Sequence, residues 1–123
     1  MNEIIESLFT GFKVDGVDIA VSYLFYEGHG EPYIVYYSYD KDNSYSAEDE
    51  IAGYVEYYDF DIYSKGNYLN IVKAVKQLLK NSGWTWQPRR DSPDMFDKDT
   101  GYFHKTICFA YPIQEIEEQS EEV

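Results

Sequence analysis

Residues 68–80 have helical spacing, while the runs on either side of them alternate between apolar and polar residues. Large apolar side chains recur every three or four positions across residues 68–80, which predicts an amphipathic helix. Asn67 is placed to cap its first turn, and Gly83 is placed to end it. The flanking runs have a period of two, which is typical of strands. This contrast limits the chain to one main helix combined with a β-sheet.

The remaining elements follow from the same patterns. The apolar spacing of residues 2–12 predicts a short N-terminal helix, and the glycines and proline of residues 27–32 predict a turn that joins two strands as a hairpin. Short connections favour antiparallel pairing. We therefore expect an α+β fold in which a mostly antiparallel sheet of about four to five strands packs against one long helix. The predicted strands are residues 17–27, 33–40, 54–63, 84–90 and 102–111.

A chain of 123 residues has the length of one domain. We expect a single α+β domain over residues 1–112. Residues 113–123 form an acidic tail without a basic residue, and they are expected to be disordered. Residues 41–53 and 92–100 are polar and acidic. The first segment is predicted to form a loop or an extended hairpin tip, and the second a loop.

The charge balance excludes several kinds of partner. Ten basic residues stand against 23 acidic ones, which gives a net charge of −13. Such a surface repels nucleic-acid backbones and anionic membranes. The single cysteine, Cys108, cannot form an intramolecular disulfide, and the N-terminal segment lacks the bases of a signal peptide. No apolar run is long enough to span a membrane, so we expect a soluble intracellular protein.

No motif in the sequence indicates a metal, a cofactor or catalysis. His104 and Cys108 share one face of a predicted strand but lie about 13 Å apart, too far for one zinc ion. Residues 97–101 resemble part of a calcium loop, but its closing Glu is missing, so a turn is expected. A small hydrolase or metal enzyme that uses Asp59, Asp61 or His104 remains an alternative. We expect no enzyme activity, no cofactor and no metal.

Tyrosine is the most unusual part of the composition, with 14 residues. The strands at residues 33–40 and 54–63 carry tyrosines on both faces, and one helix covers only one face of a sheet. The second face is therefore either hydrated or covered by another subunit. The loop acids and the only two arginines, beside Trp86, are further contact candidates. The candidate interface residues are Tyr57, Asp59, Asp61, Tyr63, Glu48, Asp49, Glu50, Arg89 and Arg90.

Two segments carry a resemblance to a known family. Residues 61–68 (DIYSKGNY) lead into the predicted helix that ends at Gly83, and residues 97–102 (DKDTGY) lead into residues 104–109 (HKTICF). This pattern resembles the tail terminators, or tail-to-head joining proteins, of long-tailed phages and prophages of Gram-positive hosts. The resemblance spans residues 17–112.

The resemblance implies a structural protein without catalytic residues. Its copies, about six, would form a ring that caps the tail tube and joins it to the head-completion protein, while DNA passes through the lumen without specific binding. The protein would act in the host cytoplasm during assembly and remain in the virion tail, with no membrane partner. Negative walls suit this role, because they would not trap DNA.

An acidic inhibitor or DNA mimic is the second hypothesis. Such a protein binds the basic cleft of a nucleic-acid enzyme with carboxylates spaced like phosphates. Glu48, Asp49, Glu50, Asp59 and Asp61 are the candidate residues for that binding.

Overall fold

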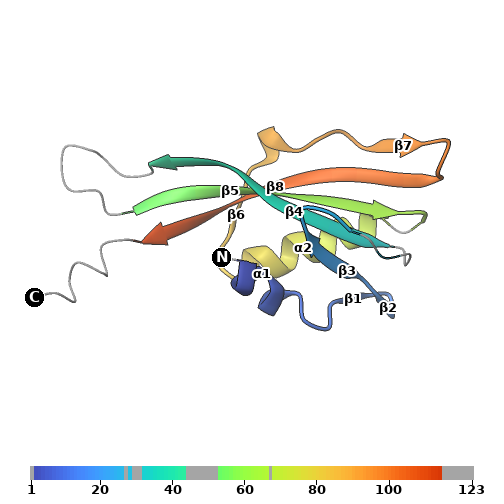
Figure 1. Cartoon of the computed structure of the whole chain (residues 1–123), viewed down its shortest axis with the longest axis horizontal. Coiled ribbons are helices and arrows are strands. Elements are labelled where there is room, and N and C mark those ends of the chain that lie inside the picture. Colours follow the sequence, from blue (N-terminus) through green and yellow to red (C-terminus); the bar gives the residue numbers. More distant parts are fainter. Residues whose placement is uncertain (1, 27, 29–31, 44–52, 67, 115–123) are drawn as a thin grey trace, which may run out of the picture.

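The structure is a computed structural model, and it describes residues 2–26, 28, 32–43, 53–66 and 68–114 (Figure 1). The residues outside these ranges include the predicted helix cap Asn67, the acids at positions 48–50 and residues 115–123. Among the described residues, neither α-helix is long and apolar enough to cross a membrane. In chain order the elements are α1 (Asn2–Leu8), β1 (Lys13–Val14), β2 (Val17–Asp18), β3 (Ala20–Tyr23), β4 (Tyr33–Asn43), β5 (Gly53–Ser64), α2 (Tyr68–Asn81), β6 (Thr85–Trp86), the 3₁₀-helix η1 (Pro88–Arg90), β7 (Met95–Asp97) and β8 (Tyr102–Gln114).

The main sheet has six strands in the order β3-β4-β5-β8-β6, and β7 also pairs with β8. The expectation of four to five strands packed against one long helix was therefore wrong. α2 has 14 residues, and α1 and the β1–β2 hairpin contribute to the same core as α2. The strand that the prediction missed is β7, which has only three residues and lies within residues 92–100, predicted as a loop. Alternation is not detectable over such short segments.

The predicted hairpin between residues 17–27 and 33–40 was also wrong. β3 runs parallel to β4, with Ala20 opposite Tyr33 and Tyr23 opposite Tyr36. Residues 17–27 do not form one strand, because the chain first makes a tight hairpin from β1 to β2. Asp15 and Gly16 have positive φ angles of 55° and 81° in the turn of that hairpin.

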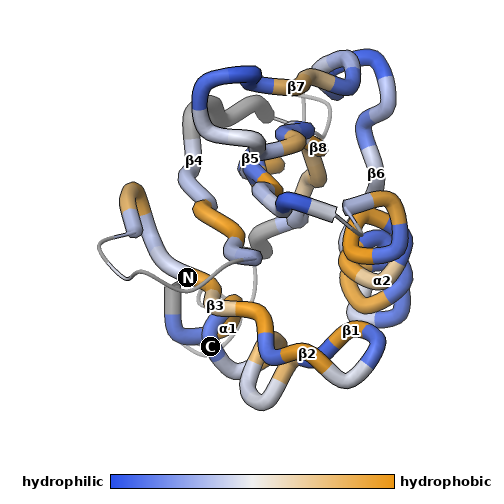
Figure 2. The backbone as a smooth tube through the Cα atoms, turned by 90° about the vertical axis from the view of Figure 1, so that its right-hand side faces the viewer, coloured by the Kyte–Doolittle hydropathy of each residue, from blue (hydrophilic) through white to orange (hydrophobic). Residues whose placement is uncertain are grey.

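The helix α2 packs against one face of the sheet, and Figure 2 shows it beside the strands, with α1 and the β1–β2 hairpin nearby. Gly83, with a φ of +94°, ends the helical segment as the sequence predicts, and the Trp84 N–H donates to the Leu79 carbonyl at 3.0 Å. Burial of each large apolar side chain contributes about 1.5–3 kcal/mol. The helix residues in this core are Ile71, Val72, Val75 and Leu79, and the main strand residues are Ile34, Tyr36, Tyr58, Phe60, Ile62, Ile107 and Phe109.

The chain between β6 and β7 follows the outer edge of β8. The predicted strand at residues 84–90 is limited to Thr85–Trp86, because Pro88 begins the 3₁₀-helix η1. The Cys108 N–H donates to the Asp91 side chain at 3.0 Å, and the Ser92 N–H donates to the Thr106 carbonyl at 2.9 Å. This segment therefore satisfies part of the edge of β8 without being a regular strand.

Three strands continue together past both helices as an arm (Figure 1). In this arm Asn43 of β4 pairs with Tyr54 of β5, and Gly53 of β5 pairs with Gln114 of β8. β8 thus continues beyond residue 112, where the sequence placed the end of the domain. β4 and β5 also take up the two ends of residues 41–53, the segment predicted as a loop or an extended hairpin tip.

Candidate functional site

The sheet face turned away from α2 carries Tyr57, Asp59, Asp61 and Tyr63 of the predicted interface residues. We call it the tyrosine face. Alternation along each strand sends every second side chain to this side, while its neighbours enter the core. The tyrosine face consists of Tyr33, Val35, Tyr37, Tyr57, Asp59, Asp61, Tyr63, His104 and Thr106.

Four stacked rings form a row across this face. The strand register places Tyr33 opposite Tyr63 and Tyr63 opposite His104. Neighbouring strands lie about 4.7–4.9 Å apart, which matches the spacing of stacked rings. The ring centroids of Tyr33 and Tyr63 are 4.7 Å apart, and those of Tyr63 and His104 are 4.2 Å apart. Tyr26, after β3, extends the row by stacking on Tyr33 at 4.5 Å.

Burial favours the uncharged forms of Tyr33, Tyr63 and His104 in this row. Burial raises the pKa of Tyr63 to about 12, with the nearby Asp61 and Tyr33 adding to the effect, and burial also raises the pKa of Tyr33. Burial lowers the pKa of His104, although Asp61 acts in the opposite direction. Burial thus shifts the imidazole toward its neutral form.

A hollow lies on each side of the aromatic row. One has a volume of about 430 Å³ and is bordered by the turn between β7 and β8. The other, of about 250 Å³, is bordered by Leu24 and Phe25. The first is lined by Tyr33, Tyr63, Asp97, Thr100, Tyr102 and His104, and the second by Leu24, Phe25, Tyr26, Tyr33, Val35, Tyr37, Asp61 and Tyr63.

The turn between β7 and β8 is held by its own side chains, as the turn interpretation of residues 97–101 predicts. The Asp97 carboxylate accepts the Asp99 N–H at 3.0 Å, and the Gly101 N–H donates to the Asp97 carbonyl at 2.7 Å. Gly101 has a φ of +81°, a conformation that favours glycine. Asp97 is thus engaged in turn chemistry.

A strained turn presents two apolar side chains at the border of the tyrosine face. The Phe25 N–H donates to the Tyr23 carbonyl at 2.8 Å, and the residue between them, Leu24, has a φ of +72°. A γ-turn with positive φ is rare and costs conformational energy in a residue other than glycine. Leu24 and Phe25 are 57% and 62% exposed, the highest values among the large apolar residues described.

The two carboxylates of the face differ in their surroundings. The Asp61 carboxylate accepts a hydrogen bond from Thr106 Oγ1 at 2.6 Å and another from the Tyr37 hydroxyl. Burial raises the pKa of Asp59 to about 6, against the opposing effect of the Cys108 thiol, which donates to it. One Asp59 oxygen is buried without a hydrogen-bond partner among the described residues. Both groups are half-buried.

Most of the predicted site residues in the described ranges come together. Tyr57, Asp59, Asp61 and Tyr63 share one face of β5, and the Arg90 guanidinium lies 3.9 Å from the Tyr57 ring centroid. Arg89 is exposed in η1 and is not among the residues of this face. Glu48, Asp49 and Glu50 lie outside the described residues.

Sequence reasoning did not find the row or the exposed pair at its border. His104 was considered as a metal ligand or a catalytic residue, and Leu24 and Phe25 only as strand residues. Alternation indicated the correct face for each ring, but the row depends on the register between strands. Among the described residues no group of three His, Cys, Asp or Glu side chains gathers to hold a metal ion. Cys108 is fully buried, as expected for a small core residue.

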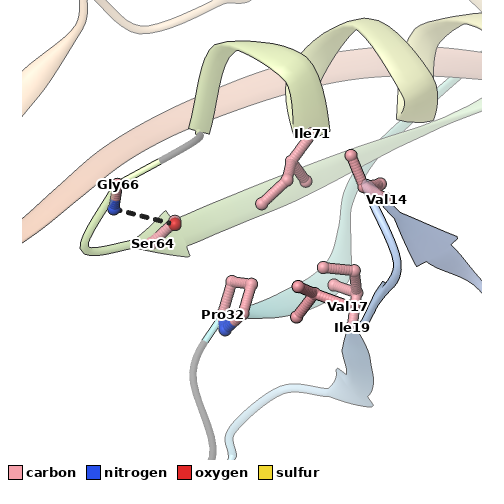
Figure 3. A pocket seen from close by; sticks show the side chains of 7 residues that line it. All are labelled: Val14, Val17, Ile19, Pro32, Ser64, Gly66 and Ile71. Carbon is pink, nitrogen blue, oxygen red and sulfur yellow. Dashed lines mark hydrogen bonds between the residues drawn. The ribbon is translucent and has the colours of Figure 1, made fainter.

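A further pocket lies on the helix side of the sheet (Figure 3). It has a volume of about 170 Å³ and is bordered by the β1–β2 hairpin and the start of α2. Its one drawn hydrogen bond runs from the Gly66 N–H to Ser64 Oγ at 3.2 Å. The lining is otherwise apolar and carries no charged side chain, so it offers packing volume and no reactive group. The lining residues are Val14, Val17, Ile19, Pro32, Ser64, Gly66 and Ile71.

Comparisons with known proteins add no assignment. No protein-family model matches the chain, and a search of curated proteins found no similar sequence.

Proposed function

We propose that this protein is a structural subunit of a phage or prophage tail. Copies of the chain form a ring that caps the tail tube, stops its growth and joins it to the head, without catalysis. In this role the protein is made in the host cytoplasm and ends in the virion tail. The resemblance of residues 61–68 and 97–109 to tail terminators is the reason for proposing a phage tail as the assembly.

The observation that carries the proposal is the tyrosine face with its exposed border. Aromatic side chains are enriched in protein interfaces because they offer a large contact area and a polar tip. Leu24 and Phe25 extend this surface with apolar side chains held out by a strained turn. Strain at such a position is retained where it serves a contact. A surface of this kind fits a protein partner better than a small substrate.

The net charge of −13 is compatible with a ring through which DNA passes. A surface of the same sign as the phosphates repels DNA and lets it move. The DNA-mimic hypothesis has less support, because Asp61 is hydrogen-bonded within the sheet and Asp59 is half-buried. These two carboxylates are not presented as a row of exposed phosphates would be.

Deletion of the gene in the phage or prophage that carries it tests the proposal. Electron microscopy of the lysate should show overlong tubes without heads beside filled heads without tails. Complete, normal particles would contradict the tail-terminator function and make the acidic inhibitor the leading hypothesis.

Point variants connect this test to the tyrosine face. Phe25→Asp places a charge on the exposed border and should fail to restore normal particles when it is supplied to the deletion strain. Leu69→Asp is the matched control, because Leu69 is also exposed, at 54%, but lies on α2. Both proteins should show the circular dichroism of the wild type. Full rescue by Phe25→Asp would show that tail assembly does not require the exposed border of the tyrosine face.

A further inference from the structure

Asp61 places a half-buried carboxylate on the tyrosine face without an ion pair to hold it. Its carboxylate accepts hydrogen bonds from Thr106 Oγ1 at 2.6 Å and from the Tyr37 hydroxyl, and both donors are uncharged groups. Neither of the two ion pairs found in the described ranges includes Asp61. Burial of a carboxylate costs free energy, and charges inside proteins are therefore usually paired with an opposite charge.

This carboxylate lines one of the two hollows beside the aromatic row. The hollow has a volume of about 250 Å³, and Asp61 is the one charged residue among the described residues that line it. The volume is below the range of about 300–1,000 Å³ that is typical of ligand pockets, so the hollow suits a single side chain better than a whole small molecule. Leu24 and Phe25 border it with exposed apolar side chains. We call it the Asp61 hollow.

The same strand face already binds an arginine of its own chain. The Arg90 guanidinium lies 3.9 Å from the centroid of the Tyr57 ring. Its charge acts on the carboxyl of Asp59, where it opposes the effect of burial. Asp61 and Tyr63 are likewise an aspartate and a tyrosine two residues apart on this face of β5. The second pair therefore has the side chains of the first pair but no arginine from the described chain.

The charges of the chain indicate where an arginine for this hollow comes from. The chain has only two arginines, and Arg89 is exposed in η1, outside the tyrosine face. A second copy brings the same net charge of −13, whereas a basic protein is attracted by that charge. We propose that the Asp61 hollow binds an arginine side chain of a different, basic protein. This inference rests on the proposed function, because it names the chemistry of a protein that the subunit contacts in the tail.

Arginine suits this hollow better than lysine does. A planar guanidinium donates two parallel hydrogen bonds to a carboxylate and is more weakly hydrated than an ammonium group. An ionised carboxylate has about four acceptor positions, and the hydroxyls of Thr106 and Tyr37 take two of them at Asp61. The apolar stem of the arginine packs on the exposed border formed by Leu24 and Phe25.

Titration of the ¹⁵N-labelled full-length protein with the peptide acetyl-Gly-Gly-Arg-Gly-Gly-amide tests the site. The amide signals of Tyr37 and Asp61 should shift in a saturable manner, with a dissociation constant of about 1 mM for this single charged contact. The same peptide with citrulline in place of arginine has nearly the same shape without the charge, and it should bind about tenfold more weakly. Equal binding of both peptides, or no saturable shift up to about 20 mM, would refute the proposal.

Removal of the carboxylate charge identifies the residue involved. Asp61→Asn should weaken binding of the arginine peptide about tenfold. Asp99→Asn is the matched control, because it removes the same charge from the exposed turn between β7 and β8 and should leave binding unchanged. Both variants should keep the signal dispersion of the folded wild type. Unchanged affinity in Asp61→Asn would contradict the proposed contact.

Complementation of the deletion strain separates this inference from the proposed function. Asp61→Asn should restore fewer complete particles than the wild type, while Arg89→Gln should restore them fully. Full rescue by Asp61→Asn, in a strain that shows the deletion defect, would leave the assembly function standing and refute the arginine contact. Normal particles in the deletion strain itself would refute the assembly function, while saturable binding of the peptide would still support the arginine site. Failure of Arg89→Gln would show that a second copy supplies the arginine and would overturn the assignment to a different protein.

Discussion

Replacement of Asp59 by Asn should stabilise the protein at alkaline pH and leave its stability nearly unchanged at acidic pH. Burial raises the pKa of this carboxyl from 3.8 to about 6, and one of its oxygens has no partner in the described structure. The folded state therefore binds the proton more tightly than the unfolded state does. As pH rises from about 4 to 6 the unfolded chain loses this proton first, so wild-type stability falls across that window and stays reduced above it.

The magnitude follows from the shift of the pKa. A shift of about two units corresponds to about 3 kcal/mol for a fully buried group. Asp59 is only half-buried, and solvent screening reduces the effect to about 1–2 kcal/mol. Asparagine has the same shape without the charge, and its side-chain oxygen can still accept from the Cys108 thiol. The gain in the free energy of unfolding should therefore be about 1–2 kcal/mol at pH 8 and close to zero at pH 4.

Urea denaturation of both proteins at pH 4 and pH 8 measures this difference. Asp61→Asn is the matched control on the same strand face. It weakens the hydrogen bonds from Thr106 and Tyr37 to a carboxylate, so at pH 8 it should lower stability by about 1–3 kcal/mol. If Asp59→Asn destabilises the protein at pH 8, or changes its stability equally at both pH values, the burial argument is refuted.

Three further substitutions test the strain and packing by chemical denaturation. Leu24→Gly should stabilise the protein by about 1 kcal/mol because glycine relieves the φ of +72°; a loss would contradict a strained turn. Tyr36→Phe should stabilise it by about 1 kcal/mol because the buried hydroxyl is unpaired among the described residues, and an equal loss would indicate a partner for that hydroxyl. Leu79→Ala should cost about 2–5 kcal/mol in the core, and a near-neutral result would place α2 outside it.

Local sequence patterns correctly predicted the elements that are determined by residues close together in the chain. The spacing of Ile71, Val75 and Leu79 predicted α2, and Gly83 predicted its end, because a helical face and a glycine cap are local properties. Alternation along β5 correctly placed Asp59 and Asp61 on one face. These predictions needed no knowledge of the partner strands.

Pairing between distant segments could not be predicted in the same way. β3 pairs in parallel with β4 and is followed by Leu24, a residue type that seldom adopts its positive φ. The position of β7 beside β8 depends on a hairpin held by Asp97. Asp15-Gly16 and residues 97–101 do carry turn residues. Their types do not indicate which distant strand each turn brings into register.

The aromatic row also depends on the register between strands that are distant in the sequence. Tyr33, Tyr63 and His104 stack only because β4 and β8 are each aligned with β5 at those positions. A slip of one residue would move each ring of the slipped strand to the opposite face. The irregularity between Ser38 and Asp40 shifts the register farther along β4, away from the row. The stacking therefore depends on how the strands are aligned, and this alignment cannot be inferred from the sequence of one strand.

Strand register also links the core to the tyrosine face. Ile34 and Ile62 pair on the helix side at the position next to Tyr33 and Tyr63, so packing of the core under α2 holds the row above it. A surface aligned in this way loses little conformational entropy when a partner binds, because its rings are already stacked. Leu24 and Phe25 follow β3, which is aligned with β4 through Tyr36, a residue of the same core. The core thus orders both parts of the surface proposed for assembly.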